Sequence, residues 1–464
     1  MTPPDAPVPT PPAPRFGTAT ATFVVVSSMV GTGVLTTSGF SMYFLGSNQL
    51  MLALWVVGGV LAVAGALTLC ELTAAIPRTG GDYAYLRAAY GPEVAFLSGW
   101  VSFFIGFGGP IAMSASAAAS YLLVPFDLSP RVVTVARPAL ATAIIVTLAA
   151  FHCRGRRASI RLQGTITVIK LAILASLAVA GVWLGWGRWG SLDDRPPLTG
   201  GVVLGMLSSL VYVTYAYTGW NAASYLAGEV DRPQSRMPRA ILLGTGLVTA
   251  LYLTLNLAYA LALPAGEVRG VVDRAGGDVT AVAPIAWVAA QRLVGPGVAA
   301  PLSFLVGLTL LASVSAYVLT GPRIVVAMAG AGQFPAWAGR VTPTGAPVLA
   351  TALQVGWALV LLWTARFEPI MTYSAIGLAV FSMLTVSSVF VIRRRIPAGS
   401  RPFRTPGYPI TPLAYLIGTG ALVVAVAHDR PAVAMASVLS ISLGVPVHDA
   451  WRLARERSSR DRVG

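Results

Sequence analysis

The sequence predicts an all-α polytopic membrane protein. Hydrophobic residues make up 55% of the 464 residues, and charged residues make up only 11%. Because a soluble domain carries about 25% charged residues, a water-soluble fold is excluded. Apolar runs recur along nearly the whole chain, and each suits a helix of roughly 20 residues that crosses the hydrocarbon core with its backbone amides bonded internally.

Twelve apolar segments are predicted to cross the membrane, which leaves both termini on one side. In chain order the predicted spans are Thr18–Leu45, Gln49–Ile76, Val94–Val124, Ala139–Cys153, Leu162–Trp186, Val202–Leu226, Ala240–Leu263, Val298–Ala329, Pro347–Thr364, Ile370–Ile392, Pro412–Ala427 and Pro431–Val445.

The arginine distribution predicts the orientation. Segments on the side of the termini carry more than twice as many arginines as those on the other side. Basic loops stay in the cytoplasm, so we expect a multi-pass protein of the cell inner (plasma) membrane with both termini cytoplasmic. The net charge of +15 therefore indicates topology and not a nucleic-acid partner. The proline-rich start lacks the features of a signal peptide.

The two cysteines, Cys70 and Cys153, are both predicted at inner helix ends. An extracellular disulfide within the chain is therefore excluded, and two small packing residues are the simplest interpretation.

Glycine interrupts two of the predicted spans near their middles. The first span contains Gly31-Thr32-Gly33, and unwinding there would leave unpaired amides at the start of an outer half-helix, where a carboxylate binds well. The sixth contains the sequence YAYTGWN over residues 215–221, whose freed carbonyls would accept hydrogen bonds from an ammonium group.

These two spans are five apart, as inverted repeats of five require, and matched interruptions indicate a transporter's midplane site. A site with free amides for a carboxylate on one side and free carbonyls for an ammonium group on the other fits an amino acid. The alternative interpretation is that these small residues only allow neighbouring helices to pack closely. The glycines of the first span do not form a nucleotide-binding loop, because no predicted strand flanks them. The predicted substrate-binding residues are Val30, Thr32, Gly33, Val34, Tyr215, Ala216, Thr218 and Asn221.

Four stretches resemble the amino acid–polyamine–organocation superfamily. Residues 29–35, MVGTGVL, resemble the G-S/A-G-I-F signature of its first helix, and residues 71–86 resemble the end of its second. Residues 215–238 are similar to its sixth helix with the segment that follows, and residues 313–335 to its eighth. The likeness runs in order over residues 15–404, which is far more specific than one glycine pair. It extends to the L-type amino acid transporter branch and to bacterial proton-coupled relatives.

The resemblance implies the fold of the sodium-coupled leucine transporter. That LeuT-like fold is a 5+5 inverted repeat with two additional C-terminal helices, and its first and sixth helices are unwound at mid-membrane. Two departures are Gly39-Phe40 where many members have proline, and Gly228 in place of the first of two glutamates. The implied divisions are a disordered cytoplasmic tail over residues 1–16, repeats over 17–200 and 201–395, the last two helices over 396–450, and a basic cytoplasmic tail over 451–464.

Lys170 in the fifth span is the one lysine among 32 basic residues. Arginine keeps its proton in proteins, whereas a desolvated lysine can release one, so lysine suits a titratable switch. The alternative is a side chain that snorkels to the inner interface. The resemblance favours a coupling role, since proton-coupled and exchanging members carry a fifth-helix lysine where sodium-coupled relatives place an ion. It implies contacts with first-helix carbonyls near Gly31 and with Ser313, or else Ser315.

Several aromatic and acidic residues are candidate gates, each with a simpler alternative role. Tyr217, Trp220 and Phe104 either close the site or only pack, and Phe103 and Phe107 share that ambiguity. Glu71 and Glu229 are expected at inner helix ends, where pairing with Arg78, Arg232 or Arg236 forms a gate or anchors a loop. Asn221 either binds substrate or holds the unwound segment.

The predicted function is secondary active transport of small or neutral L-amino acids by alternating access, through proton symport or amino acid exchange and independent of sodium. The expected partners are the amino acid, a proton and the bilayer. Members of the similar family that need a disulfide-linked heavy subunit use an outer-loop cysteine for it, and none is found here, so the resemblance implies no such subunit. Alternatives are a cationic amino acid or polyamine exchanger, or a non-transporting sensor or channel on this scaffold. A membrane enzyme is disfavoured, because the three histidines fall at helix ends and no H-E-x-x-H occurs; no cofactor or metal is expected.

Overall fold

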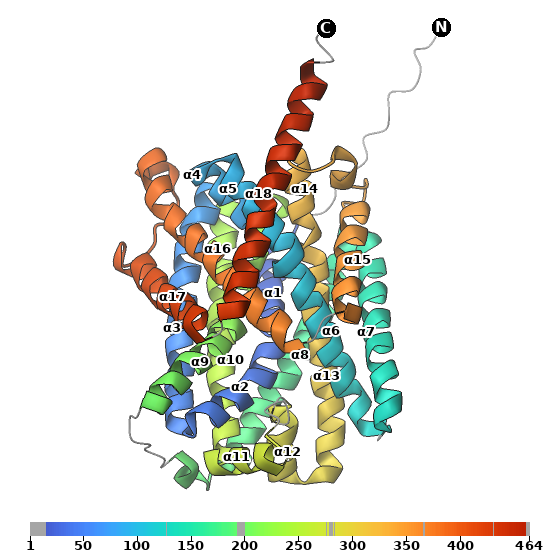
Figure 1. Ribbon diagram of the computed structural model, residues 1–464, viewed down its shortest axis with the longest axis vertical. Helices are drawn as coiled ribbons and strands as arrows, with labels where there is room; N and C mark the ends of the chain where they lie inside the picture. The colour runs from blue at the N-terminus through green and yellow to red at the C-terminus, as the bar shows by residue number, and fades with distance from the viewer. Residues whose placement is uncertain are drawn as a thin grey trace.

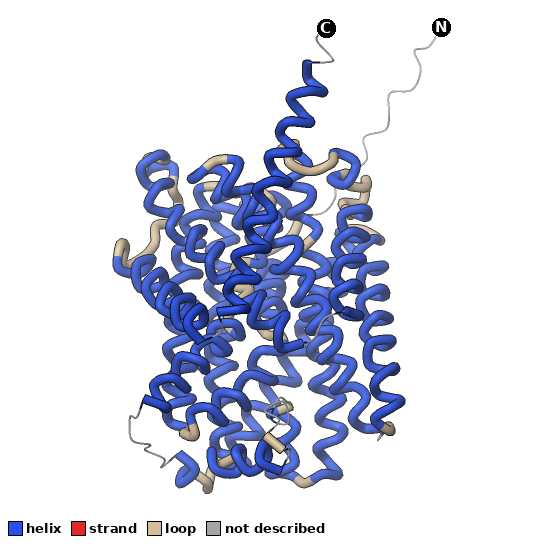
Figure 2. Tube along the Cα trace, viewed as in Figure 1, coloured by secondary structure: helices blue, strands red, loops and turns tan. Residues whose placement is uncertain are grey.

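The computed structural model describes residues 15–460 except residues 127, 193–199, 275, 278–281, 283, 365–366 and 430. Nearly all of the predicted N-terminal tail, residues 1–14, therefore lies outside the described residues. The described chain forms a bundle of helices joined by loops that gather mainly at its two ends (Figure 2). An isolated bridge joins Phe16 to Val230.

The helices follow one another along the chain with few long loops. Their bounds are α1 Thr18–Met29, α2 Thr32–Leu45, α3 Asn48–Ala75, α4 Asp82–Tyr90, α5 Pro92–Val101, η1 Ser102–Phe107, α6 Gly108–Leu123, η2 Val124–Phe126, α7 Pro130–Cys153, α8 Arg156–Gly185, η3 Trp189–Leu192, α9 Gly200–Ala216, η4 Ala222–Glu229, α10 Pro233–Ala262, α11 Ala265–Arg274, α12 Ile285–Val294, α13 Pro296–Thr320, α14 Pro322–Gly330, η6 Ala336–Gly339, α15 Val348–Thr364, α16 Phe367–Arg395, η7 Ala398–Ser400, α17 Ile410–Asp429 and α18 Pro431–Arg460.

Within the described residues, nine helical segments are long and apolar enough to cross a membrane. They are Thr18–Leu45, Asn48–Ala75, Pro92–Phe126, Arg131–Cys153, Arg156–Gly185, Pro233–Ala262, Pro296–Gly330, Ser374–Arg395 and Ile410–His428. This confirms a polytopic helical membrane protein. Helices also lie at the other three predicted spans, as α9, α15 and α18. The full count of twelve crossings stays a prediction.

Three helices begin at least six residues earlier than predicted, at Pro130, Arg156 and Pro233 instead of Ala139, Leu162 and Ala240. Hydropathy indicates where a chain enters lipid, whereas a helix begins where the backbone amides of its first turn can be accommodated. Proline is tolerated in that first turn because its missing N–H has no partner there anyway. Similarly, α18 continues to Arg460 over much of the predicted basic tail.

The interior of the bundle is built around α1, α2, α9 and α10. Helix α1 contacts α8, α10 and α13, whereas α2 packs along α9. Helices α4, α5 and α14 lie at the end of the bundle from which α18 projects, and α11 and α12 lie at the opposite end (Figure 1). None of α4, α11 and α12 was predicted, because short helices outside the apolar runs leave little mark on hydropathy.

Candidate functional site

The first interruption separates α1 from α2 at residues 30 and 31. Val30 has φ −76° and ψ 79°, and Gly31 has φ −108° and ψ −146°, so neither continues the helix. Helix α2 then begins at Thr32. Among the described residues, no hydrogen-bond acceptor meets the amides of Thr32, Gly33 and Val34. These donors, together with the helix dipole, favour a carboxylate at this point.

The carbonyl groups at the end of α1 are held by side chains from three other helices. Tyr317 of α13 donates to the Ser28 carbonyl. The single hydroxyl hydrogen of Tyr252 on α10 is shared between the Met29 carbonyl and the Ala216 carbonyl at the end of α9. One phenol therefore bridges the two interruptions, which fixes their spacing.

Lys170 on α8 is completely buried and faces the same helix end. Its Nζ donates to the Val30 carbonyl, to the Ser27 carbonyl at 3.2 Å and to Ser313 Oγ at 2.8 Å. Ser313 in turn donates to the Val30 carbonyl at 2.7 Å. The predicted contacts with first-helix carbonyls and Ser313 are confirmed, although the carbonyls belong to residues 27 and 30 and not to Gly31. Burial excludes the snorkelling alternative.

Ser315 does not contact Lys170. Its hydroxyl donates to Gln163 Oε1 at 2.7 Å and lies 2.9 Å from His152 Nε2. On a helix, residues two positions apart point in different directions, which explains why only one of the two serines reaches the lysine. Sequence inspection missed His152 and Gln163 as buried polar residues because both lie near predicted helix ends.

The second interruption follows α9, which ends at Ala216. Gly219 has φ +102°, a conformation that other residues rarely adopt, and a 3₁₀ helix, η4, resumes at Ala222. A Cβ on Gly219 would lie 2.8 Å from the Ser28 carbonyl carbon, and a Cβ on Gly33 would lie 2.5 Å from the Ala216 Cα. The two interruptions therefore lie against each other, with glycine at both points of closest approach.

The remaining predicted binding residues have different surroundings. Tyr215 is buried with its hydroxyl beside Thr32, and Thr218 Oγ1 donates back to the Tyr215 carbonyl at 2.7 Å. Asn221 Nδ2 donates to Asp82 Oδ2 at 2.8 Å. Asn221 therefore holds a carboxylate beside the interruption, and sequence inspection missed Asp82 because it looks like an ordinary loop acid.

Three aromatic residues were predicted as gates. Tyr217 packs among Trp55 and Tyr252, and its hydroxyl donates to the Trp55 carbonyl at 3.0 Å. Trp220 is buried against Tyr415 beside the interruption.

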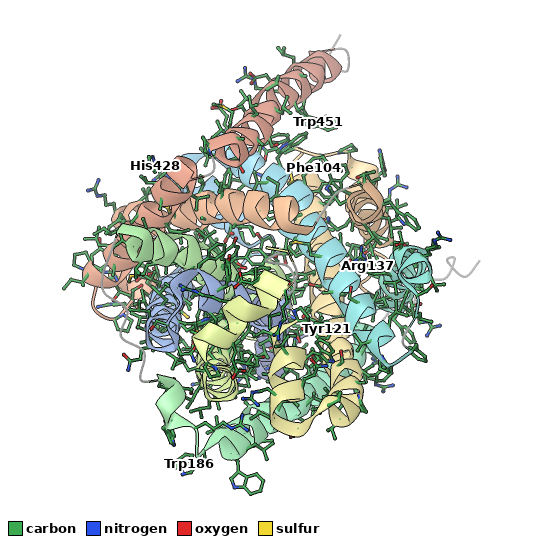
Figure 3. The ribbon with its side chains drawn as sticks, turned by 60° about the horizontal axis from the view of Figure 1, so that its bottom comes forward. Phe104, Tyr121, Arg137, Trp186, His428 and Trp451 are labelled. Carbon is green, nitrogen blue, oxygen red and sulfur yellow. The ribbon has the colours of Figure 1, made fainter. Side chains whose placement is uncertain are left out.

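Phe104 does not lie at the interruption. It packs between Trp100 and Trp357 toward the periphery of the bundle (Figure 3). The neighbouring Phe107 faces the interruption instead and lines a cavity there. The π-helical turn η1 changes the register of side chains in this segment, and hydropathy carries no signal of such a turn.

The two predicted gate glutamates have other partners than expected. Glu71 is completely buried and pairs with Arg393 at 2.7 Å and with Arg401, not with Arg78. Glu229 pairs with Arg156 at 2.9 Å and Arg323 at 3.3 Å, not with Arg232 or Arg236. Arg236 pairs with Asp231 at 3.0 Å. The expected partners were sequence neighbours, whereas the actual ones come from helices packed against each glutamate.

Known proteins similar to this chain are amino acid transporters. The Serine/threonine exchanger SteT of Bacillus subtilis (strain 168) is 26% identical over 414 residues, which cover 87% of this chain and 89% of that protein. The Large neutral amino acids transporter small subunit 2 of Homo sapiens is 27% identical over 450 residues, 94% of this chain and 79% of that protein. The Asc-type amino acid transporter 1 of Mus musculus is 25% identical over 445 residues, 93% of this chain and 80% of that protein.

A family profile described as Amino acid permease matches residues 16–442, nearly the whole bundle. The match includes both interruptions, Lys170 and the ion pairs of Glu71 and Glu229. The chain therefore belongs to the amino acid permease family of the amino acid–polyamine–organocation superfamily, whose members are transporters and not enzymes, and it is related to the L-type amino acid transporter branch.

Proposed function

We propose that this permease carries small or neutral L-amino acids across the plasma membrane by alternating access, as an exchanger or a proton symporter that does not use sodium. The observation that carries the proposal is the juxtaposition of two helix interruptions with opposite polarity. Free amides begin α2, and the main chain of residues 217–221 leaves helical geometry directly beside them.

Each of the two interruptions suits one charged end of a zwitterionic amino acid. The amides of residues 32–34 would hold the carboxylate, since anions are stabilised at helix N-termini. The carbonyls of Tyr217, Thr218 and Trp220 would accept hydrogen bonds from the ammonium group; among the described residues they meet no donor. This arrangement is the one expected for a LeuT-like 5+5 repeat in which both interruptions lie at mid-membrane.

Lys170 would couple these elements. Its ammonium group joins α1 and α13 through the Val30 carbonyl and Ser313, and it meets no carboxylate within the described chain. Loss of its proton would remove the charge that holds the helices together. Proton binding would then bias the equilibrium between open and closed states.

The family and the arginine distribution support an orientation in which α4, α5 and α14 face the cytoplasm. Membrane proteins keep basic loops on that side. In this orientation the Glu71 and Glu229 ion pairs lie at the cytoplasmic end, where Glu229 would be part of an inner gate.

Counterflow into proteoliposomes tests the proposal. Vesicles loaded with unlabelled L-serine, L-threonine or L-leucine should accelerate uptake of the labelled amino acid, whereas protein-free vesicles and vesicles loaded with the D-enantiomer should not. An imposed proton gradient without internal substrate separates symport from exchange. Absence of flux for every one of the twenty amino acids would contradict amino acid transport by this chain.

A further inference from the structure

A cavity of about 60 Å³ lies beside the α9 interruption, and its lining contains no residue of α2. Residues 218–222 form one wall, so the cavity borders the proposed amino acid site directly. The π-helical turn η1 contributes Ser102 and Phe107, and α4 contributes Asp82. Such turns often occur at functional sites because they re-aim side chains within a helix.

The carboxylate of Asp82 is incompletely satisfied. The residue is only 5% exposed. Its Oδ2 accepts from Asn221 at 2.8 Å and from the Tyr225 hydroxyl at 3.5 Å, whereas no donor reaches Oδ1 in the part of the chain that the structure describes. The buried Thr385 hydroxyl faces the same carboxylate and has no hydrogen-bond partner of its own there. Even where the Thr385 hydroxyl donates to this carboxylate, each carboxylate oxygen can accept a further hydrogen bond, so Oδ1 can still meet a donor from a ligand.

That donor is expected to carry a positive charge. Burial raises the pKa of Asp82 to about 6, against the opposing effect of its hydrogen bonds, so the group is mainly ionised at neutral pH. The other titratable groups that face it are the hydroxyls of Tyr85, Tyr225 and Tyr415. No basic side chain pairs with Asp82 among the described residues. A buried carboxylate without a counter-ion attracts a cation.

The walls of the cavity suit an ammonium group. Phe107, Trp220, Tyr317 and Tyr415 line it with aromatic rings. Aromatic faces attract cations, and Ser102 adds a hydroxyl that accepts hydrogen bonds. One carboxylate oxygen, a hydroxyl and aromatic faces match a primary ammonium, which has three donors and a compact charge.

We propose that this cavity is a second binding station, in which Asp82 receives the ammonium group of the amino acid as it leaves the α2–α9 site toward the face that carries α4. The proposal rests on the proposed transport function. It assigns Asp82 to substrate exit and Asn221 to holding the Asp82 carboxylate in place.

The transport test measures KM separately from the two faces, in vesicles of known orientation. A hydrogen bond to a charged group contributes roughly 1.5–3 kcal/mol, so Asp82→Asn should raise KM from the α4 face about tenfold or more. KM from the opposite face should stay within about twofold, and Asp82→Glu should restore part of the loss. The matched control is Asp231→Asn, a partly exposed carboxylate paired with Arg236. An equal change on both faces, or no change on either, overturns the proposal.

A binding test needs no transport. Purified protein is heated with and without n-propylamine, a primary amine without a carboxylate. The amine should raise Tm at pH 7.5, and the shift should disappear as pH falls through about 6, because protonated Asp82 loses its charge. It should also disappear in Asp82→Asn. A wild-type Tm that does not respond overturns the proposal even where amino acid flux is observed. A response without any flux retains the cation site and contradicts only the transport function.

Discussion

At the scale of single residues, the site depends on donors that hold the broken end of α1. Lys170, Tyr252 and Tyr317 each reach a different carbonyl there, and only the lysine carries a charge. Lys170 was predictable because it is the one lysine in an arginine-rich chain. The tyrosines and Asp82 were not, because nothing local distinguishes a tyrosine that packs from one that donates to a distant carbonyl.

Substitutions of Ser313 and Lys170 test the coupling role. Because Ser313 contacts Lys170 whereas Ser315 bonds to Gln163, Ser313→Ala should lower the rate of exchange about tenfold, from the loss of roughly 1.5 kcal/mol, and Ser315→Ala should lower it less. Lys170→Ala and Lys170→Arg should both remove the contribution of Lys170 to the pH dependence of flux, since neither side chain titrates in the working range, and should leave the change near pH 6 that Asp82 causes. The measurement is the initial rate of counterflow from pH 5 to pH 9. A pH profile unchanged in both Lys170 variants would contradict the coupling role.

At the scale of elements, hydropathy and the structure agree that helices occupy the apolar runs, and they differ on where helices begin and where they change register. The early starts at Pro130 and Pro233 and the π turn η1 depend on hydrogen bonding, which leaves no trace in apolar periodicity. The two interruptions were predictable because glycine destabilises a helix interior, so its presence there indicates a close approach, as at Gly33, or a special backbone conformation, as at Gly219.

Helix α2 approaches α9 at Gly33, and this approach yields a prediction with an internal control. A Cβ on Gly33 would lie 2.5 Å from the Ala216 Cα, so Gly33→Ala must push the helices apart. A Cβ on Gly31 would meet only the Tyr317 hydroxyl, at 3.8 Å, so Gly31→Ala should be tolerated. Overpacking costs about 1–3 kcal/mol, so Gly33→Ala should lower Tm by several degrees and abolish counterflow. Equal Tm values for the two variants would show that α2 and α9 are not closely packed at Gly33.

At the scale of the whole molecule, two ionic clusters fasten helices that are distant in sequence. The completely buried Glu71 on α3 binds Arg393 and Arg401, and Thr405 also donates to it, so this cluster joins α3 to the end of α16 and the segment that follows. Glu229 at the end of η4 binds Arg156 on α8 and Arg323 on α14. The partners lie far away along the chain, which is why reasoning from sequence neighbours chose the wrong arginines.

The Glu229 cluster joins elements that would have to separate in the proposed alternating access. The main chain of Phe16, just before α1, is hydrogen-bonded to Glu229 and Asp231, so this cluster also secures the start of α1. Its carboxylate is partly exposed, at 16%, and a pair of this kind contributes about 1 kcal/mol. Glu229→Gln should therefore shift the population about fivefold toward the state open at this face.

A cysteine at Ser102 reports that opening, because Ser102 is buried in the cavity beside the α9 interruption. In a background with Cys70 and Cys153 replaced by alanine, Glu229→Gln should raise the rate at which a membrane-impermeant maleimide labels Ser102→Cys from the α4 face. Glu267→Gln breaks an exposed pair with Arg292 near the opposite end and should leave that rate unchanged. Equal labelling in both variants would mean that Glu229 only anchors a loop, because a contact that does not break during opening cannot change how often the cavity is exposed.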